Sequence, residues 1–201
     1  MVKVQDLPQK LDSLEPGSAV ALKVDVDSYF DVITALTDKF PRGREMQVIY
    51  TTSTISSATI IQVLDAFDIG RENIQFVDAV SYMTMGASEQ PEGVTFVESP
   101  TMLENISLKI EYLLKKYPTE QNTVILDSID SLSIHNNNRI LSEFLHILIS
   151  NLRSHDCFTF ILSVSEQESE EIDNMLAMVC DDFIDVNPEE EGSASEVESL
   201  G

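Results

Sequence analysis

The sequence predicts a single α/β domain with three layers, in which a mainly parallel β-sheet lies between helices on both faces. Short β-branched and apolar runs alternate with amphipathic segments of helix length from Ala19 to Val186. Most of these runs are apolar at consecutive positions, as strands covered on both faces must be. The chain has 201 residues, of which 43% are hydrophobic, so it is long enough to bury such a core.

The predicted strands follow one another at regular intervals along the chain. They lie at residues 19–24, 47–50, 73–77, 94–97, 123–126, 158–164 and 183–186, with 94–97 the weakest of them. Strands that alternate with helices require right-handed crossovers and therefore a parallel sheet. Ligands of such sheets bind beyond the carboxyl ends of the strands, where we expect the functional residues.

Four amphipathic stripes at helical spacing fill the intervals between the strands, at residues 29–40, 60–67, 106–117 and 141–152. Gly70 is predicted to take the left-handed conformation that ends the second of these helices. Ser99-Pro100-Thr101, together with Glu104, is predicted to supply the N-cap and capping box at the start of the third. The acidic run Glu166–Glu171 is predicted to form the first turn of a further helix.

Composition divides the chain into two parts. Residues 1–187 form the predicted domain, whereas residues 188–201 contain five acids, no base and almost nothing to bury. We therefore expect residues 188–201 to be a disordered acidic tail. Within the domain, the stretch Ser81–Gly93 is a long predicted loop, and Met83 and Met85 in it either contact a partner or fold back on the core.

The charge of the chain narrows the classes of partner. Acids outnumber bases 35 to 12, which gives a net charge of −23 and a pI near 4.1. This charge argues against direct nucleic-acid binding, because phosphates would approach against the field. The N-terminus lacks a signal-peptide core and no apolar stretch is long enough to cross a membrane, so we expect a cytoplasmic protein without a membrane partner. Two cysteines are too few for a disulfide framework or a zinc site.

The most informative segment is Asn122–His135, in which a buried strand runs directly into Asp127, and we expect this strand to be central in the sheet. An aspartate fixed at the end of a rigid strand can hold Mg²⁺ through water, while Ser128 supports the same ligand shell, and this is the Walker B pattern. Four apolar residues followed by aspartate also occur where the aspartate only caps the next turn. Both interpretations are open on the sequence.

At these residues the chain resembles the RecA-like ATPases, and within them the KaiC-like group, over residues 14–187. The resemblance rests on Glu15-Pro16-Gly17-Ser18 before the first strand, on a strand ending at Tyr50 followed by a Thr/Ser turn and a helix, and on Val124–Leu132 around the Walker B aspartate. It implies a RecA-like P-loop NTPase fold with a nucleotide site at the carboxyl ends of the strands.

The sequence departs from that family at the phosphate-binding loop. A working loop reads G-x-x-x-x-G-K-[ST], so that amides and a lysine surround the phosphates. When Lys23 is placed at the first glycine, Ser28 falls at the second glycine, Tyr29 at the lysine and Phe30 at the hydroxyl position. No glycine lies between Gly17 and Gly43, so the Walker A motif is degenerate.

Two further features of the sequence act against nucleotide chemistry. Asp25 and Asp27 place like charges where a triphosphate would bind. The members of the resembled group carry water-activating glutamates after the second strand, but Thr51–Ser57 contains no carboxylate. The resemblance therefore supplies no catalytic residue. It leaves Ser28, Asp127 and Ser128 as remnants of a nucleotide-binding site, with Asp127 as the candidate Mg²⁺ ligand.

Three functional hypotheses follow. The first is a non-catalytic RecA/KaiC-like domain, a pseudo-ATPase without a cofactor that acts through a protein partner or a second copy as a regulatory or assembly factor. The second is an atypical ATPase that binds Mg-ATP through Asp127. The third is a recombinase-like paralogue involved in DNA repair that reaches DNA through a partner.

Overall fold

The computed structural model describes residues 2–44, 46–82, 91–164 and 169–187. The predicted acidic tail at 188–201 lies outside these residues, as do Met83, Met85 and the first part of the acidic run Glu166–Glu171.

The sheet contains eight described strands, and every pair of neighbouring strands is parallel. The strands are β1 (Val2–Lys3), β2 (Ala19–Val24), β3 (Met46–Thr52), β4 (Ile74–Asp78), β5 (Val94–Phe96), β6 (Gln121–Asp127), β7 (Phe158–Ser163) and β8 (Asp182–Asn187). Their order across the sheet is β1-β8-β2-β7-β6-β3-β4-β5. The chain thus crosses over the sheet repeatedly, as its alternating pattern predicts.

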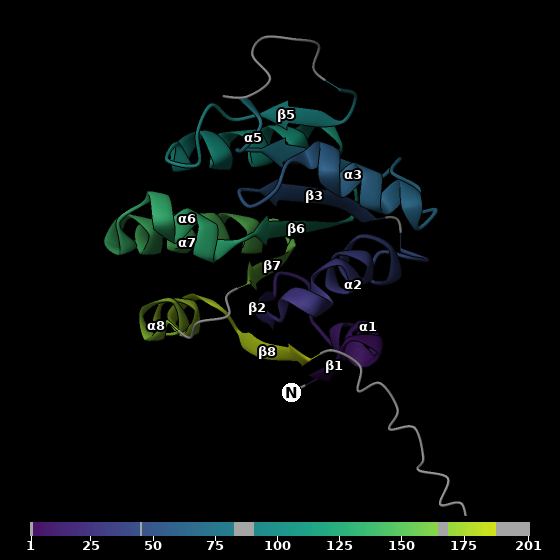
Figure 1. Ribbon diagram of the computed structural model, residues 1–201, viewed down its shortest axis with the longest axis horizontal. Coiled ribbons are helices and arrows are strands. Elements are labelled where there is room, and N and C mark those ends of the chain that lie inside the picture. The colour runs from purple at the N-terminus through teal and green to yellow at the C-terminus, as the bar shows by residue number, and fades with distance from the viewer. Residues whose placement is uncertain (1, 45, 83–90, 165–168, 188–201) are drawn as a thin grey trace, which may run out of the picture.

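Helices cover both faces of this sheet (Figure 1). On one face lie α1 (Leu7–Leu11), η2 (Val26–Ser28), α2 (Tyr29–Thr34), its π-helical continuation η3 (Ala35–Lys39) and α3 (Ser57–Ala66). On the other face lie α5 (Leu103–Lys116), α6 (Ile129–His135), α7 (Asn138–Arg153) and α8 (Glu170–Val179). A short 3₁₀ helix, η1 (Val4–Asp6), precedes α1. The predicted three-layer α/β fold is confirmed.

Two hydrophobic clusters, one on each face, hold the layers together. Alternate residues of one strand enter different clusters: Leu22 of β2 packs with α1, α2 and α3, whereas its neighbour Ala21 packs with the helices of the other face. Both side chains are fully buried. Burial on both faces explains why the strands are apolar at consecutive positions.

Strand β6 lies in the middle of the sheet, between β7 and β3. Its last residue, Asp127, is in register with Thr52 of β3 and Leu162 of β7. The predicted position of Asp127, at the carboxyl end of a central strand, is therefore confirmed. The peptide bond between Asp127 and Ser128 is cis.

The structure corrects two expectations about helix ends. Helix α3 ends at Ala66, and the left-handed residue beyond it is Asp68 (φ 57°), not Gly70. Asp68 takes this conformation because a short polar side chain tolerates it better than most residues do. Helix α5 begins after Met102, without a side-chain cap, so neither Ser99 nor Thr101 caps it. The sequence did not predict β1, η1, α1 or α6, because each of these elements is too short to show a clear period.

Candidate functional site

Asp127 lies at the carboxyl edge of the sheet and is completely buried. Its main-chain oxygen accepts a hydrogen bond of 2.6 Å from the amide of Ser53, which follows β3. The parallel register of β3 and β6 produces this contact, because both strands end at the same level. The edge that the sequence predicts as functional is therefore closely packed around the aspartate.

Two tyrosine hydroxyls donate hydrogen bonds to the same carboxylate oxygen of Asp127. The Tyr29 hydroxyl lies 2.5 Å from Oδ2, and the Tyr50 hydroxyl lies 2.7 Å from it. Tyr29 is the first residue of α2, and Tyr50 lies within β3. The other oxygen, Oδ1, has the Thr54 hydroxyl at 3.4 Å. Tyr29, which falls at the lysine position when the sequence is set against the phosphate-binding loop pattern, thus contacts Asp127 directly.

Burial shifts the pKa values of Asp127, Tyr29 and Tyr50. Loss of solvent raises the pKa of Asp127 above its ordinary value, and the hydrogen bonds from Tyr29 and Tyr50 lower it only in part. Burial, together with the charge of Asp127, also raises the pKa of both tyrosines. Both phenols therefore remain protonated at neutral pH and keep their role as donors.

Ser128, and not Asp127, caps the helix that follows. The Ser128 hydroxyl lies 3.4 Å from the amide of Ser131 at the start of α6, and it also accepts from Thr54 at 3.2 Å. The carboxylate of Asp127 takes no part in the cap. The sequence left open whether Asp127 holds Mg²⁺ or caps the next turn. In the structure the capping residue is Ser128, so capping does not account for Asp127.

Ser28 is buried beside Tyr29, at the junction of η2 and α2. Its hydroxyl has no hydrogen-bond partner among the described residues. The preceding turn is closed on itself: the Asp25 side chain accepts from the amide of Asp27 at 2.9 Å, and the main-chain oxygen of Asp25 accepts from the amide of Ser28 at 3.0 Å. Of the three predicted remnant residues, Asp127 and Ser128 are linked through Thr54, whereas the Ser28 hydroxyl forms no hydrogen bond with either.

The Thr and Ser hydroxyls at the end of β3 and in the turn after it form hydrogen bonds with main-chain oxygens of the chain. The Thr52 hydroxyl donates to the main-chain oxygen of Ile55 at 2.5 Å. The Ser53 hydroxyl lies 3.2 Å from the main-chain oxygens of Asp127 and Ser128. The Ser131 hydroxyl in turn donates to the main-chain oxygen of Ser53. These bonds join β3 to the segment between β6 and α6.

Sequence reasoning missed a second buried aspartate at the same edge. Asp78, the last residue of β4, accepts five hydrogen bonds of 2.6 to 2.8 Å, from the amides of Ser57, Val80 and Ser81 and the hydroxyls of both serines. Burial raises its pKa, but the hydrogen bonds from Ser57 and Ser81 outweigh burial and leave the pKa below 3.8. The sequence pattern that predicted Asp127 could also have predicted Asp78, because β4, like β6, ends in apolar residues followed by an aspartate.

Neither aspartate belongs to a preformed metal cluster. Across residues 2–44, 46–82, 91–164 and 169–187, no group of three or more histidine, cysteine or acidic side chains is arranged to hold a metal ion. None of the described helices has the length and apolar character needed to cross a bilayer.

Comparisons with known proteins give a match in structure only. No protein-family model matches the sequence, and no curated protein matches it. A KaiC-like protein from the hyperthermophilic archaeon Pyrococcus horikoshii aligns with a TM-score of 0.60 and 15% identity, over 89% of this chain and 74% of that protein. This chain has the KaiC-like, RecA-type fold. At 15% identity the likeness extends to the fold alone.

Within the KaiC-like fold, the edge around Asp127 is the place where the resemblance implies a nucleotide. The fold implied for residues 14–187 is confirmed. The loss of the nucleotide site stays a prediction, as do the roles of Ser28, Asp127 and Ser128. The sequence did not predict that Tyr29 of α2 and Tyr50 of β3 both donate hydrogen bonds to the Asp127 carboxylate at this edge.

Proposed function

We propose that this KaiC-like-fold chain does not hydrolyse nucleotide and acts through contacts with other proteins, as a regulatory or assembly factor. The observation that carries the proposal is the buried Asp127 carboxylate, whose Oδ2 accepts from both Tyr29 and Tyr50. These two bonds occupy one of the two carboxylate oxygens that could take part in a metal-ligand shell.

The first argument concerns Mg²⁺. The ion prefers ionised carboxylates and keeps several water molecules in an octahedral shell. Asp127 has no exposed surface for such a shell, and its raised pKa favours the uncharged form more than in an ordinary aspartate. Binding of Mg²⁺ through Oδ2 of Asp127 would require both phenols to move away. That movement would leave buried hydroxyls without partners, which is costly.

The second argument concerns phosphate. The two exposed aspartates of the turn, Asp25 and Asp27, add to the negative field of a chain with net charge −23. Tyr29, at the position of the phosphate-binding lysine, is neutral and already bonded to Asp127. Neutralisation of the phosphate charge and binding of Mg²⁺ are therefore both weakened at this edge of the sheet. Activation of a water molecule is weakened as well, because Thr51–Ser57 contains no carboxylate.

Apolar side chains near this edge support a role in protein contact. Val26 in η2 is 54% exposed, and Phe30 in α2 is 38% exposed. Both belong to the short segment that contains Asp25 and Asp27. A protein surface with apolar and basic groups would suit this combination better than a triphosphate does. The partner can be another protein or a second copy of the chain.

A thermal-shift and hydrolysis experiment with Mg-ATP tests the proposal. At millimolar Mg-ATP we expect no change in the melting temperature and no hydrolysis above background, in the parent chain and in Asp127→Asn alike. A ligand at a hundredfold excess over its Kd adds about 2.7 kcal/mol of stability, which such a scan detects readily. Asp65→Asn, at a half-exposed carboxylate on α3, is the matched control for loss of one charge.

A saturable shift in the parent chain that is lost in Asp127→Asn and kept in Asp65→Asn would contradict the proposal. That result would favour the alternative of an atypical ATPase that binds Mg-ATP through Asp127. The partner is sought by co-purification of the full chain from its native cell, followed by mass spectrometry. We expect the recovered complex to be insensitive to added Mg-ATP.

A further inference from the structure

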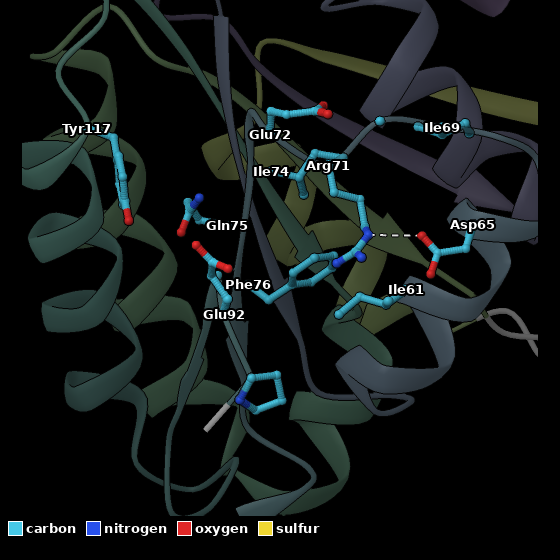
Figure 2. A pocket seen from close by; sticks show the side chains of 13 residues that line it. Ile61, Asp65, Ile69, Arg71, Glu72, Ile74, Gln75, Phe76, Glu92 and Tyr117 are labelled. Carbon is cyan, nitrogen blue, oxygen red and sulfur yellow. Dashed lines mark hydrogen bonds and ion pairs between the residues drawn. The ribbon is translucent and has the colours of Figure 1, made fainter. Parts of the chain in front are cut away.

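A cavity of about 800 Å³ lies at the amino ends of β4 and β5, at the opposite end of the strands from Asp127. Its floor is apolar and includes Ile61 of α3 together with Ile74 and Phe76 of β4. Figure 2 shows Ile61 and the Asp65–Arg71 pair on one side, and Gln75, Glu92 and Tyr117 on the other. Its volume is in the range of sites that take small ligands or short peptide segments.

A second cavity, of about 380 Å³, adjoins the first. The two share four lining residues, namely Gln75, Pro91, Gly93 and Tyr117. The second cavity extends along the start of β5 toward α5, where Lys109, Tyr112 and Lys116 line it. The two cavities therefore adjoin along these four residues, and we call them together the β5 groove.

Gln75 lies between the two halves of the β5 groove. Its side chain is only 8% exposed, lines both cavities, and makes no hydrogen bond with any described residue. Its carboxamide is not among the buried polar groups that lack a partner, so it keeps contact with solvent on the side of the groove and is open to a ligand there. An amide group of a ligand, which offers one donor and one acceptor, would satisfy both ends of this carboxamide.

The two halves of the β5 groove carry opposite charges. In the larger half, Asp65 and Arg71 neutralise each other through an ion pair of 3.0 Å. Glu72 and Glu92 remain there, and neither forms an ion pair with a described base.

In the smaller half, no described carboxylate pairs with Lys109 or Lys116, and the Lys116 ammonium lies over the rings of Tyr112 and Tyr117 at 5.7 and 5.1 Å. These positive charges are notable in a chain with only 12 bases against 35 acids.

We propose that the β5 groove binds an extended peptide segment of a protein partner, with basic residues at one end, acidic residues at the other and a large apolar residue between them. The basic end faces Glu72 and Glu92, the apolar side chain enters the floor at Phe76, and the acidic end reaches Lys109 and Lys116. A main-chain amide of the peptide bonds to Gln75. This inference rests on the proposed function and assigns a site and a chemistry to the protein contact.

Titration of the ¹⁵N-labelled full chain with synthetic peptides, followed by NMR, tests this site. The probes are N-acetylated, C-amidated Lys-Lys-Leu-Gly-Glu-Glu and the same residues in reverse order, because either chain direction suits the groove. The control peptide, Lys-Glu-Leu-Gly-Lys-Glu, has the same composition without the separation of charge. We expect one of the first two peptides to bind saturably, with shifts centred on Gln75, and the control to bind about tenfold more weakly or less.

Matched variants identify the contacts. Gln75→Leu, which keeps the size of the side chain, is expected to weaken the binding peptide about fivefold or more, and Lys109→Glu with Lys116→Glu about tenfold or more. The double variant is expected to gain binding of Lys-Lys-Leu-Gly-Lys-Lys, which the parent chain rejects. Lys39→Glu, on the distant segment η3, makes an equal type of charge change and is expected to alter nothing.

The proposal is overturned if no peptide gives a saturable shift at about 1 mM, or if binding survives unchanged in Gln75→Leu and in the double lysine variant. Circular dichroism of each variant verifies that it is folded. The result is independent of the Mg-ATP experiment. Failure of the peptides together with a silent Mg-ATP scan removes only the β5 groove site, whereas an Asp127-dependent response to Mg-ATP removes the proposed function.

Discussion

The hydroxyl of Tyr29 lies 2.5 Å from Oδ2 of Asp127 and joins the start of α2 to the carboxyl end of β6. The two residues are 98 positions apart in the chain. A carboxylate at this position of a parallel sheet is well placed to hold a metal-bound water. Here the Oδ2 atom of that carboxylate accepts a hydrogen bond from a phenol in the neighbouring helical layer instead. This contact links the stability of the fold directly to the question of nucleotide binding.

Tyr29→Phe is expected to destabilise the chain by about 1 to 3 kcal/mol, because it removes one donor from a buried carboxylate. Urea unfolding measures the change. Tyr112→Phe removes the hydroxyl of an exposed tyrosine and is expected to change stability by less than about 0.5 kcal/mol. Equal effects of the two substitutions would show that the Tyr29 bond contributes little.

The pH dependence of stability should differ in a defined way between the parent chain and Asp127→Asn. The folded-state pKa of Asp127 lies above the ordinary value of 3.8, so the folded chain holds this proton more tightly than the unfolded chain. Acidification through the folded-state pKa toward 3.8 therefore stabilises the parent chain relative to the variant. Urea unfolding between pH 7 and pH 4 measures the difference. A difference that stays constant, or that falls on acidification, would contradict the raised pKa.

Asp78→Asn should show the opposite pH dependence. The folded-state pKa of Asp78 lies below 3.8, so its contribution is fully present above 3.8 and is lost as the pH falls through the folded-state value. At pH 7 we expect a loss of about 3 kcal/mol or more, because an amide cannot accept all five hydrogen bonds. The loss should shrink below pH 3.8. A loss that is equal at pH 7 and pH 3 would mean that charge is irrelevant at this site.

Removal of residues 188–201 is expected to leave the melting temperature within a few degrees of that of the full chain. This segment has five acids, no base and only Val197 and Leu200 as large apolar residues, which cannot offset the entropy of ordering. Calorimetry of the shortened chain measures the effect. A larger drop would indicate that the segment packs against the domain.

Much of the fold could be predicted because it depends on patterns that are local in the sequence. Runs such as Ala19–Val24 are apolar at every position but one, Lys23, and a strand covered on both faces needs such a pattern. The shortest elements were not predicted, because a two-residue strand such as Val2–Lys3 shows no period.

The sequence by itself determined that Asp127 ends a central buried strand, since a parallel sheet collects the carboxyl ends of its strands at one edge. Asp78 ends β4 with the same pattern, yet the pKa shifts of the two aspartates have opposite directions. Only the tertiary structure decided this, because it surrounds the Asp78 carboxylate with five close donors, whereas that of Asp127 has two phenols and the Thr54 hydroxyl at 3.4 Å. The charge state of a buried carboxylate depends on desolvation and on nearby donors, and those donors come from segments far apart in the chain.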